Sequence, residues 1–113
     1  MLIISIDVGI RNLAYVIIEV KELNIHNIIE WNVIELCDKK EKASSVLNEK
    51  IGYSIYTQFD GILNTYKFDK IIIENQIGQN AIKMKTIQGM ITMYFIMKDY
   101  DINILLVIMH VIN

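Results

Sequence analysis

The chain has 113 residues, which fits one compact domain, and its 53% hydrophobic and 21% charged residues exclude intrinsic disorder. The formal net charge of −2 gives the whole chain no basic field, so a nucleic-acid role has to rest on local patches of charge. The single cysteine, Cys37, has no partner for a disulfide or a cysteine-based zinc site, which makes a reducing, intracellular compartment the default expectation. No apolar run is long enough for a membrane span, and the start lacks the basic flank of a secretion signal.

Three strand-like runs occupy the first third of the chain. Residues 1–8 are almost wholly apolar and are followed by Gly9, a pattern typical of a strand that is buried on both faces. Residues 12–20 and 26–36 follow as two more strands, and the polar break at 21–24 predicts that they form an antiparallel meander. Trp31 lies in the third run, where we expect it to pack rather than to bind a ligand.

The rest of the chain alternates between helical and strand-like patterns. Between residues 41 and 66, apolar side chains recur every three or four positions, which predicts an amphipathic helix with Ser44 or Ser45 as a candidate inner cap. Residues 69–74 are expected to form a buried fourth strand, 75–80 a polar loop, 81–98 a second helix and 102–109 a fifth strand. The order β-β-β-α-β-α-β requires right-handed crossovers with parallel pairing. We therefore expect a single α/β domain over residues 1–113, with a mixed five-stranded sheet of ribonuclease H-like type.

Two acidic residues end two of the predicted strands. Asp7 closes the first strand and Glu74 closes the fourth, so parallel pairing of these strands would bring both carboxylates to the sheet edge where open α/β sheets bind ligands. Such a pair favours a hard divalent cation such as Mg²⁺, and two such ions about 3.5–4 Å apart can drive phosphodiester hydrolysis. Gly9, just after Asp7, would let the backbone approach a ligand closely. The alternative is that both acids simply face solvent at strand ends.

Two segments resemble the motifs of one nuclease family. IISIDVGIRNLAYVII, residues 3–18, is similar to the first motif of the RuvC-like Holliday junction resolvases, although an Asp-x-Gly strand end also opens sugar kinases and actin-like ATPases. IIIENQIGQNAIKMKTIQGMITMYF, residues 71–95, more specifically resembles the second motif of the resolvases of poxviruses and other large DNA viruses, which are related to the fungal mitochondrial enzymes. The order and spacing of elements agree along nearly the whole chain.

The resemblance implies a homodimeric endonuclease of viral origin that acts in the infected cell and has no membrane partner. Such an enzyme cuts four-way DNA junctions with Mg²⁺ or Mn²⁺. It makes Asp7 and Glu74 the catalytic, metal-binding residues of the first and fourth strands. The residues on the DNA side would be Asn75, Gln76, Gln79, Asn80, Lys83 and Lys85. Without the family, that segment is equally well interpreted as a solvated loop followed by a polar helix start.

The family pattern also predicts what this chain lacks. Family members continue past the fifth strand into a basic segment and a final helix with the last metal-binding aspartates, whereas no acid follows Asp101 here. We therefore expect a C-terminally truncated form without the final helix, which binds Mg²⁺ poorly and cuts junctions slowly or not at all. Two alternatives are a non-catalytic remnant that binds DNA or a partner and a ribonuclease of the same fold. Half of an actin-like or sugar-kinase ATPase is disfavoured, because such enzymes need two related domains.

Overall fold

The computed structural model describes residues 1–22, 25–75 and 81–106. The elements follow the predicted order: β1 (Leu2–Asp7), β2 (Asn12–Glu22), β3 (Ile25–Glu35), a 3₁₀ turn η1 (Ala43–Ser45), α1 (Asn48–Thr65), β4 (Lys70–Asn75), α2 (Ala81–Met97) and β5 (Ile102–Leu106). The five strands form one sheet in the order β3-β2-β1-β4-β5. The part of the fifth strand that we expected at residues 107–109 lies outside the described residues.

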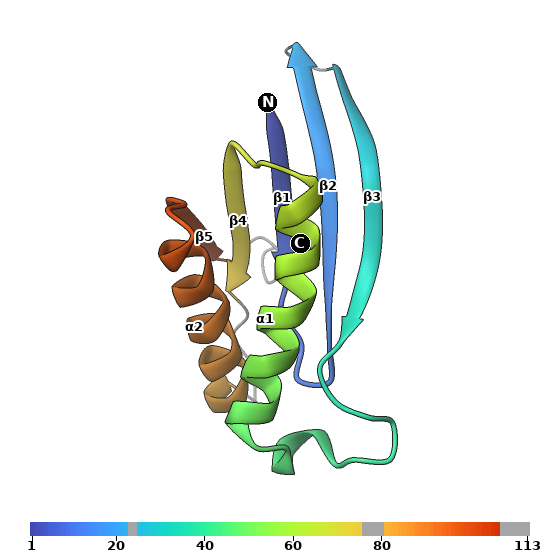
Figure 1. Ribbon diagram of the computed structural model, residues 1–113, viewed down its shortest axis with the longest axis vertical. Helices are drawn as coiled ribbons and strands as arrows, with labels where there is room; N and C mark the ends of the chain where they lie inside the picture. The colour runs from blue at the N-terminus through green and yellow to red at the C-terminus, as the bar shows by residue number, and fades with distance from the viewer. Residues whose placement is uncertain (23–24, 76–80, 107–113) are drawn as a thin grey trace.

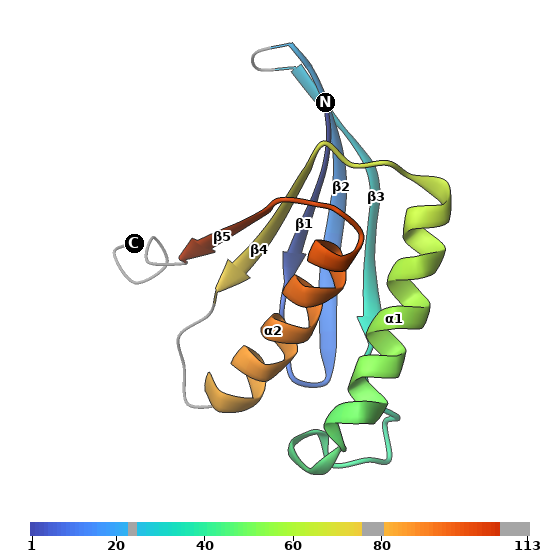
Figure 2. The same cartoon turned by 60° about the vertical axis from the view of Figure 1, so that its left-hand side comes forward.

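The sheet is mixed, as the sequence predicts. β1 and β2 pair antiparallel, as do β2 and β3, whereas β4 runs parallel to β1 and β5 runs parallel to β4. The helices α1 and α2 provide the two crossovers, and both lie on the same face of the sheet (Figures 1 and 2). No described helix covers the opposite face, and none of the described helices is long and apolar enough to cross a membrane.

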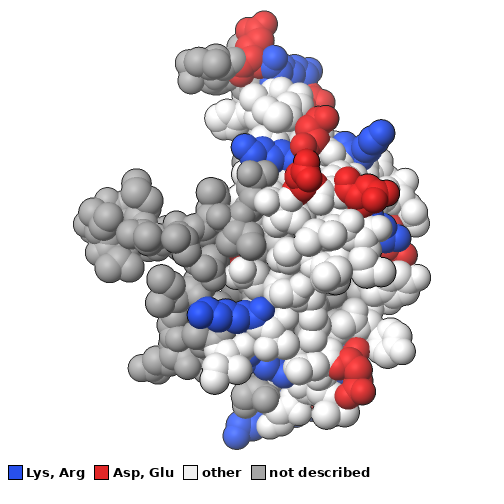
Figure 3. Space-filling model, turned by 90° about the vertical axis from the view of Figure 1, so that its left-hand side faces the viewer, with Lys and Arg blue, Asp and Glu red and all other residues white. Residues whose placement is uncertain are grey.

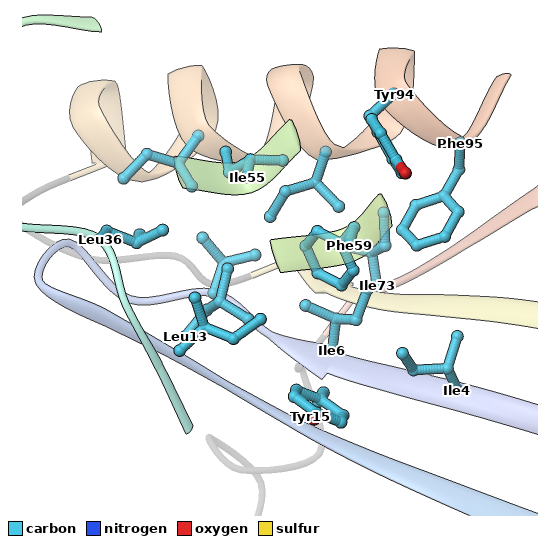
Figure 4. Packing of buried hydrophobic residues seen from close by; sticks show 14 of the residues in the cluster. Ile4, Ile6, Leu13, Tyr15, Leu36, Ile55, Phe59, Ile73, Tyr94 and Phe95 are labelled. Carbon is cyan, nitrogen blue, oxygen red and sulfur yellow. The ribbon is translucent and has the colours of Figure 1, made fainter. Parts of the chain in front are cut away.

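The core lies between the sheet and the two helices. Alternate residues of β1 and β4, including Ile6 and Ile73, point toward the helices and are fully buried. They meet Phe59 of α1 and Phe95 of α2, whose rings pack edge to face with centroids 5.2 Å apart (Figure 4). Each fully buried side chain of this kind contributes about 1.5–3 kcal/mol relative to an exposed one.

The expectation that the first and fourth strands are buried on both faces is wrong. On the face away from the helices, Ser5 of β1 and Ile72 of β4 are only half-buried, and Asp7 is exposed. The reason is that both crossovers place their helices on one side, so the apolar runs of these strands have one packed face and one open face among the described residues. We call the face of the sheet away from α1 and α2 the open face.

The first helix also begins later than the apolar stripe suggests. Neither Ser44 nor Ser45 caps it. The helix α1 starts at Asn48, and its N-cap residue, Leu47, provides no side-chain capping hydrogen bond. The preceding segment is held in another way, because the Arg11 guanidinium donates to the carbonyl oxygens of Asp38 at 3.0 Å and Glu41 at 2.7 Å. Those contacts keep the chain around residues 38–41 against the β1–β2 turn and out of the helix.

Replacing Phe59 with alanine is expected to lower the free energy of unfolding by about 3–5 kcal/mol, because it leaves a cavity where the two helices meet the sheet. Tyr53→Ala on the same helix is the matched control: the Tyr53 side chain is 72% exposed, so its loss should change the stability by less than about 0.5 kcal/mol. Urea unfolding followed by circular dichroism measures both. Equal effects of the two variants would contradict the position of the core.

Candidate active site

Asp7 and Glu74 lie directly opposite each other on neighbouring parallel strands. In the register of β1 and β4, Asp7 pairs with Glu74, Ser5 with Ile72 and Ile3 with Lys70. Residues so paired project to the same face of a sheet, and their strands are about 4.8 Å apart. The predicted juxtaposition of the two acids is therefore confirmed.

Both acids line a hollow on the open face. Its volume is about 440 Å³, and besides the two carboxylates its lining includes Ser5 of β1, Val16 of β2, and Ile28 and Trp31 of β3. Asp7 is exposed and Glu74 half-buried, so a ligand can reach both. The hollow is acidic at the strand ends of β1 and β4 and becomes apolar toward β3.

Gly9 has a structural role at the turn from β1 to β2. A Cβ atom at this position would lie 2.3 Å from the backbone oxygen of Asn12, so only glycine fits the turn from β1 to β2. The absence of a Cβ atom thus allows the backbone of residues 9 and 12 to approach closely. Gly9 acts on the site indirectly, by letting β2 return beside Asp7.

Tyr15 borders the same hollow, but its hydroxyl is bound elsewhere. It donates a hydrogen bond to the Glu30 carboxylate, which also accepts one from the hydroxyl of Tyr66 at 3.3 Å. Burial, followed by this contact with Glu30, raises the pKa of Tyr15 to about 12. The phenol therefore stays protonated at neutral pH, and Tyr15 is not a candidate general base.

The donor set at the strand ends fits a hard divalent cation. Two adjacent carboxylates offer the oxygen ligands that Mg²⁺ prefers, and its remaining positions are usually filled by water and phosphate oxygens. Among the described residues, no group of three or more His, Cys, Asp or Glu side chains is placed to hold a metal. Asp7 and Glu74 therefore suit one hydrated ion and do not on their own complete a two-ion centre.

The acids before β5 do not extend this site. Ile102 of β5 pairs with Ile71, and Leu105 pairs with Glu74, so Asp101 lies beyond the opposite end of the strands. Asp101 is four residues before Leu105, the residue that pairs with Glu74, and four residues of a strand span about 13 Å. Asp101 therefore adds no ligand to the site at Asp7 and Glu74.

The expected DNA-contacting residues are described only in part. Asn75 is the last residue of β4, whereas Gln76, Gln79 and Asn80 lie outside the described residues. Lys85 is exposed near the start of α2.

Lys83 has a structural contact that the sequence did not suggest. Its ammonium group donates to the carbonyl oxygen of Val46 at 2.7 Å and to Oδ1 of Asn48 at 3.1 Å. These contacts join the first turn of α2 to the start of α1. Any contribution of Lys83 to phosphate binding would compete with this link between the helices.

Trp31 is the residue near the site that sequence reasoning missed. The indole is 74% exposed and lines the hollow, so the expectation that it packs is wrong for the described structure. Trp31 pairs with Val16 of β2, which places it on the open face. The sequence pattern did not show on which face of the sheet Trp31 lies, because an irregularity in the β2–β3 register at Ile29 interrupts the alternation of inward and outward side chains along β3.

Charge is distributed without a single dominant patch on the face shown in Figure 3. Lysines and acidic residues alternate over the described part of this surface, in keeping with the net charge of −2. Affinity for a polyanion would therefore depend on a few individual lysines.

The sequence also matches a known protein family. A family model described as "Poxvirus A22 protein" matches residues 1–107. The chain belongs to the poxvirus A22 protein family. The viral resolvase-type resemblance of the two motifs is thus confirmed at the level of family. No individual curated protein matches the chain at a significant level.

Solved structures with a similar fold include proteins of a bacterium and of a virus. RuvC of Thermus thermophilus in complex with a Holliday junction substrate has a TM-score of 0.76 at 17% identity, covering 94% of this chain and 63% of that one. A separate Thermus thermophilus RuvC structure gives 0.74 at 15% identity, with 94% and 64% covered. The fowlpox virus resolvase in complex with its Holliday junction DNA gives 0.61 at 19% identity, with 92% and 60% covered. The predicted fold class is confirmed, and the chain spans 60–64% of the length of these structures.

Asp7→Asn and Glu74→Gln are each expected to weaken Mn²⁺ binding at least about tenfold, because even the loss of a residue that only orients a metal ligand costs that much. Electron paramagnetic resonance of free Mn²⁺ during a titration measures the affinity. Asp101→Asn is the matched control, since this exposed carboxylate lies at the other end of the strands. Equal losses in all three variants would show that the ion binds only to diffuse negative charge.

Proposed function

We propose that residues 1–113 form a single RuvC-like nuclease domain that binds four-way DNA junctions and whose chemistry is Mg²⁺-dependent hydrolysis of a phosphodiester. The observation that carries the proposal is the in-register pairing of Asp7 with Glu74 at the end of two parallel strands, in a chain of the poxvirus A22 protein family. The Holliday junction bound in the similar RuvC and fowlpox virus resolvase structures supports the choice of substrate.

The roles of the two acids follow from their position. Asp7 and Glu74 would together hold one Mg²⁺ ion, with Mn²⁺ as a substitute, and their negative charge would otherwise repel a phosphate. When bound, the ion supplies a positive charge for the phosphate and a more acidic water molecule. The exposed carboxylate of Asp7 and the half-buried one of Glu74 leave room for a DNA strand to reach the ion from the open face.

The segment after β4 is proposed to contact the DNA backbone. Amide side chains donate hydrogen bonds to phosphates and lysines neutralise them. This segment contains Asn75, Gln76, Gln79, Asn80, Lys83 and Lys85. Of the two lysines, Lys85 is the better phosphate ligand, because the ammonium group of Lys83 is held at the start of α1.

We further propose that the protein acts as a homodimer in the infected cell. A four-way junction has two equivalent strands to cut, so two copies of the site match its symmetry. The outer surface of α2 exposes Met93 by 54% and Met97 by 74%, and these apolar side chains provide contact area for a second copy.

A binding protein without catalytic activity is the second candidate. It is favoured by the absence of a third metal-ligating side chain beside Asp7 and Glu74 among the described residues. The two candidates share the DNA surface and differ only in hydrolysis.

We expect the 113-residue chain to bind a labelled four-way junction more tightly than a duplex of the same sequence, and to nick it very slowly or not at all in Mg²⁺ or Mn²⁺. Two carboxylates hold a strongly hydrated ion loosely, and a two-ion mechanism needs further ligands. Gel-shift titration in Ca²⁺ and a nicking assay measure the two properties.

Asp7→Asn is the control for any nicking that is seen. Robust nicking that this variant abolishes would show that the site is more complete than we infer, and nicking that it leaves unchanged would exclude Asp7 as a metal ligand. Equal affinity for junction and duplex would contradict junction specificity, and preferential cleavage of an RNA–DNA hybrid would indicate a ribonuclease.

Lys85→Ala is expected to weaken junction binding and to reduce its salt dependence by about one charge, because each phosphate contact releases about one counterion. Lys67→Ala is the matched control: Lys67 is also exposed but precedes β4, at the opposite end of the strand from Glu74. Affinity measured across a salt series distinguishes them. An unchanged slope for Lys85→Ala would place the DNA surface elsewhere.

A further inference from the structure

The chain between β3 and α1 carries three lysines that have no role in the site described above. Residues 38–42 have the sequence Asp-Lys-Lys-Glu-Lys, and we call them the lysine segment. The side chains of Lys39, Lys40 and Lys42 are all exposed. In the part of the chain that the structure describes, none of the three forms an ion pair. Their charges are therefore available to an anionic partner.

The two acids of the lysine segment are used inside the fold. The Asp38 carboxylate accepts the backbone N–H of Lys40 at 3.2 Å. The Glu41 carboxylate accepts the backbone N–H of Asp38 at 3.1 Å and the ammonium group of Lys50 at 2.7 Å. Arg11 and Lys50 offset the charges of these two acids, so the charge that the segment presents to solvent is that of its three exposed lysines.

Arg11 fixes the place of the lysine segment in the molecule. It lies in the turn that follows Asp7, and its guanidinium donates to the carbonyl oxygens of Asp38 at 3.0 Å and Glu41 at 2.7 Å. The carbonyl oxygen of Arg11 accepts the N–H of Leu36 at 2.8 Å. The segment is thus tied to the turn beside Asp7, at the end of the molecule where both helices begin (Figures 1 and 2).

The strand register gives the distance from the acids. Asp7 pairs with Ala14, and Ala14 pairs with Val33, so Val33 lies two strands, or about 10 Å, from Asp7. Glu35, which ends β3, is two residues farther along and therefore roughly 12 Å from Asp7. The lysine segment begins three residues later, which places it roughly 12–20 Å from Asp7. A duplex covers this distance in about four to six base pairs at about 3.4 Å each.

We propose that the lysine segment binds the phosphate backbone of a duplex arm, about four to six base pairs from the phosphate at Asp7 and Glu74. This inference rests on the proposed function and adds a second contact to the same DNA. Lysines neutralise phosphates without reading the bases, so the segment would hold an arm of any sequence. It would raise the affinity for branched and continuous DNA alike, and would leave the preference for a junction to the rest of the surface.

The strand order supports an extended polyanion over a small anion. The lysine segment follows β3, whereas the exposed Lys85 lies near the start of α2, after β4. Since β2 and β1 lie between β3 and β4 in the sheet, a chain of phosphates that reaches both sites must cross the end of β1, where Asp7 lies. Three fully solvated lysines do not enclose a small anion, but they suit successive phosphates of a DNA strand.

Lysine acetylation followed by mass spectrometry tests the contact directly. With a saturating duplex, or with a four-way junction, in Ca²⁺, Lys39, Lys40 and Lys42 should lose most of their reactivity toward an acetylating reagent. Lys67 and Lys70 should keep theirs, because they lie at the opposite end of β4 from Glu74. Unchanged reactivity of the lysine segment in a saturated complex would overturn the proposal.

A charge-removing variant gives the second measurement. The triple variant Lys39→Gln, Lys40→Gln and Lys42→Gln should raise the Kd for the junction about 10- to 100-fold at about 0.1 M salt. It should also reduce the salt dependence by about two to three charges, because each phosphate contact releases about one counterion. Replacing the same three lysines with arginine keeps the charge and should retain both the affinity and the slope.

The matched control removes the same charge from the other end of the molecule. The triple variant Lys21→Gln, Lys67→Gln and Lys70→Gln has the same net charge, and all three of its positions are exposed. It should keep the salt slope of the wild-type chain. Equal losses in the two glutamine variants would show that DNA responds only to net charge, and would overturn the proposal. Circular dichroism of each variant confirms that a loss of binding is not a loss of folding.

Comparison of junction with duplex separates the remaining outcomes. Similar losses of affinity for both DNAs in the lysine-segment variant would support contact with a duplex arm. A loss for the junction alone would place the segment at the branch point and overturn the proposal. If the wild-type chain does not prefer the junction, but the lysine-segment variant binds both DNAs more weakly than the control does, the backbone contact stands and the proposed junction specificity is wrong.

Discussion

β1 and β4 are far apart in the chain, and their parallel pairing forms the centre of the sheet. It places the isoleucines Ile4 and Ile6 beside Ile71 and Ile73, and the four fully buried side chains form the floor on which Phe59 and Phe95 pack. The same pairing brings Asp7 opposite Glu74. A shift of one residue in this register would turn the isoleucines to the open face and separate the acids. The stability of the core and the geometry of the candidate site therefore depend on one register.

The two faces of the sheet have different roles for the same reason. Because α1 and α2 both pack on one face, that face provides the hydrophobic energy of folding, and the described part of the open face remains accessible to a ligand. Accessibility has an energetic cost, since apolar side chains such as Ile28 and Trp31 stay in water.

Two cationic side chains, Arg11 and Lys83, have a structural role. Arg11, the only arginine, holds the segment before α1 through two backbone carbonyls. Lys83 joins the starts of the two helices. The positive charge available to DNA is thereby reduced to exposed lysines such as Lys85. In the function that we propose, junction binding would therefore depend on a metal ion held by Asp7 and Glu74 as well as on lysines.

The order of strands and helices was predictable from local pattern, because the change from apolar runs to three- and four-residue spacing is recorded in the sequence itself. The order also predicted parallel pairing of the first and fourth strands, and with it the meeting of Asp7 and Glu74. Local pattern did not reveal that Trp31 is exposed, that Gly9 is needed by its own turn, or that Lys83 is bound to α1. Each of these depends on which face the helices cover or on contacts between residues distant in the chain. The sequence by itself thus determined the elements, their order and the two acids, whereas the tertiary structure alone decided which face of the sheet is packed and which is open to a ligand, because burial depends on where the crossovers place their helices.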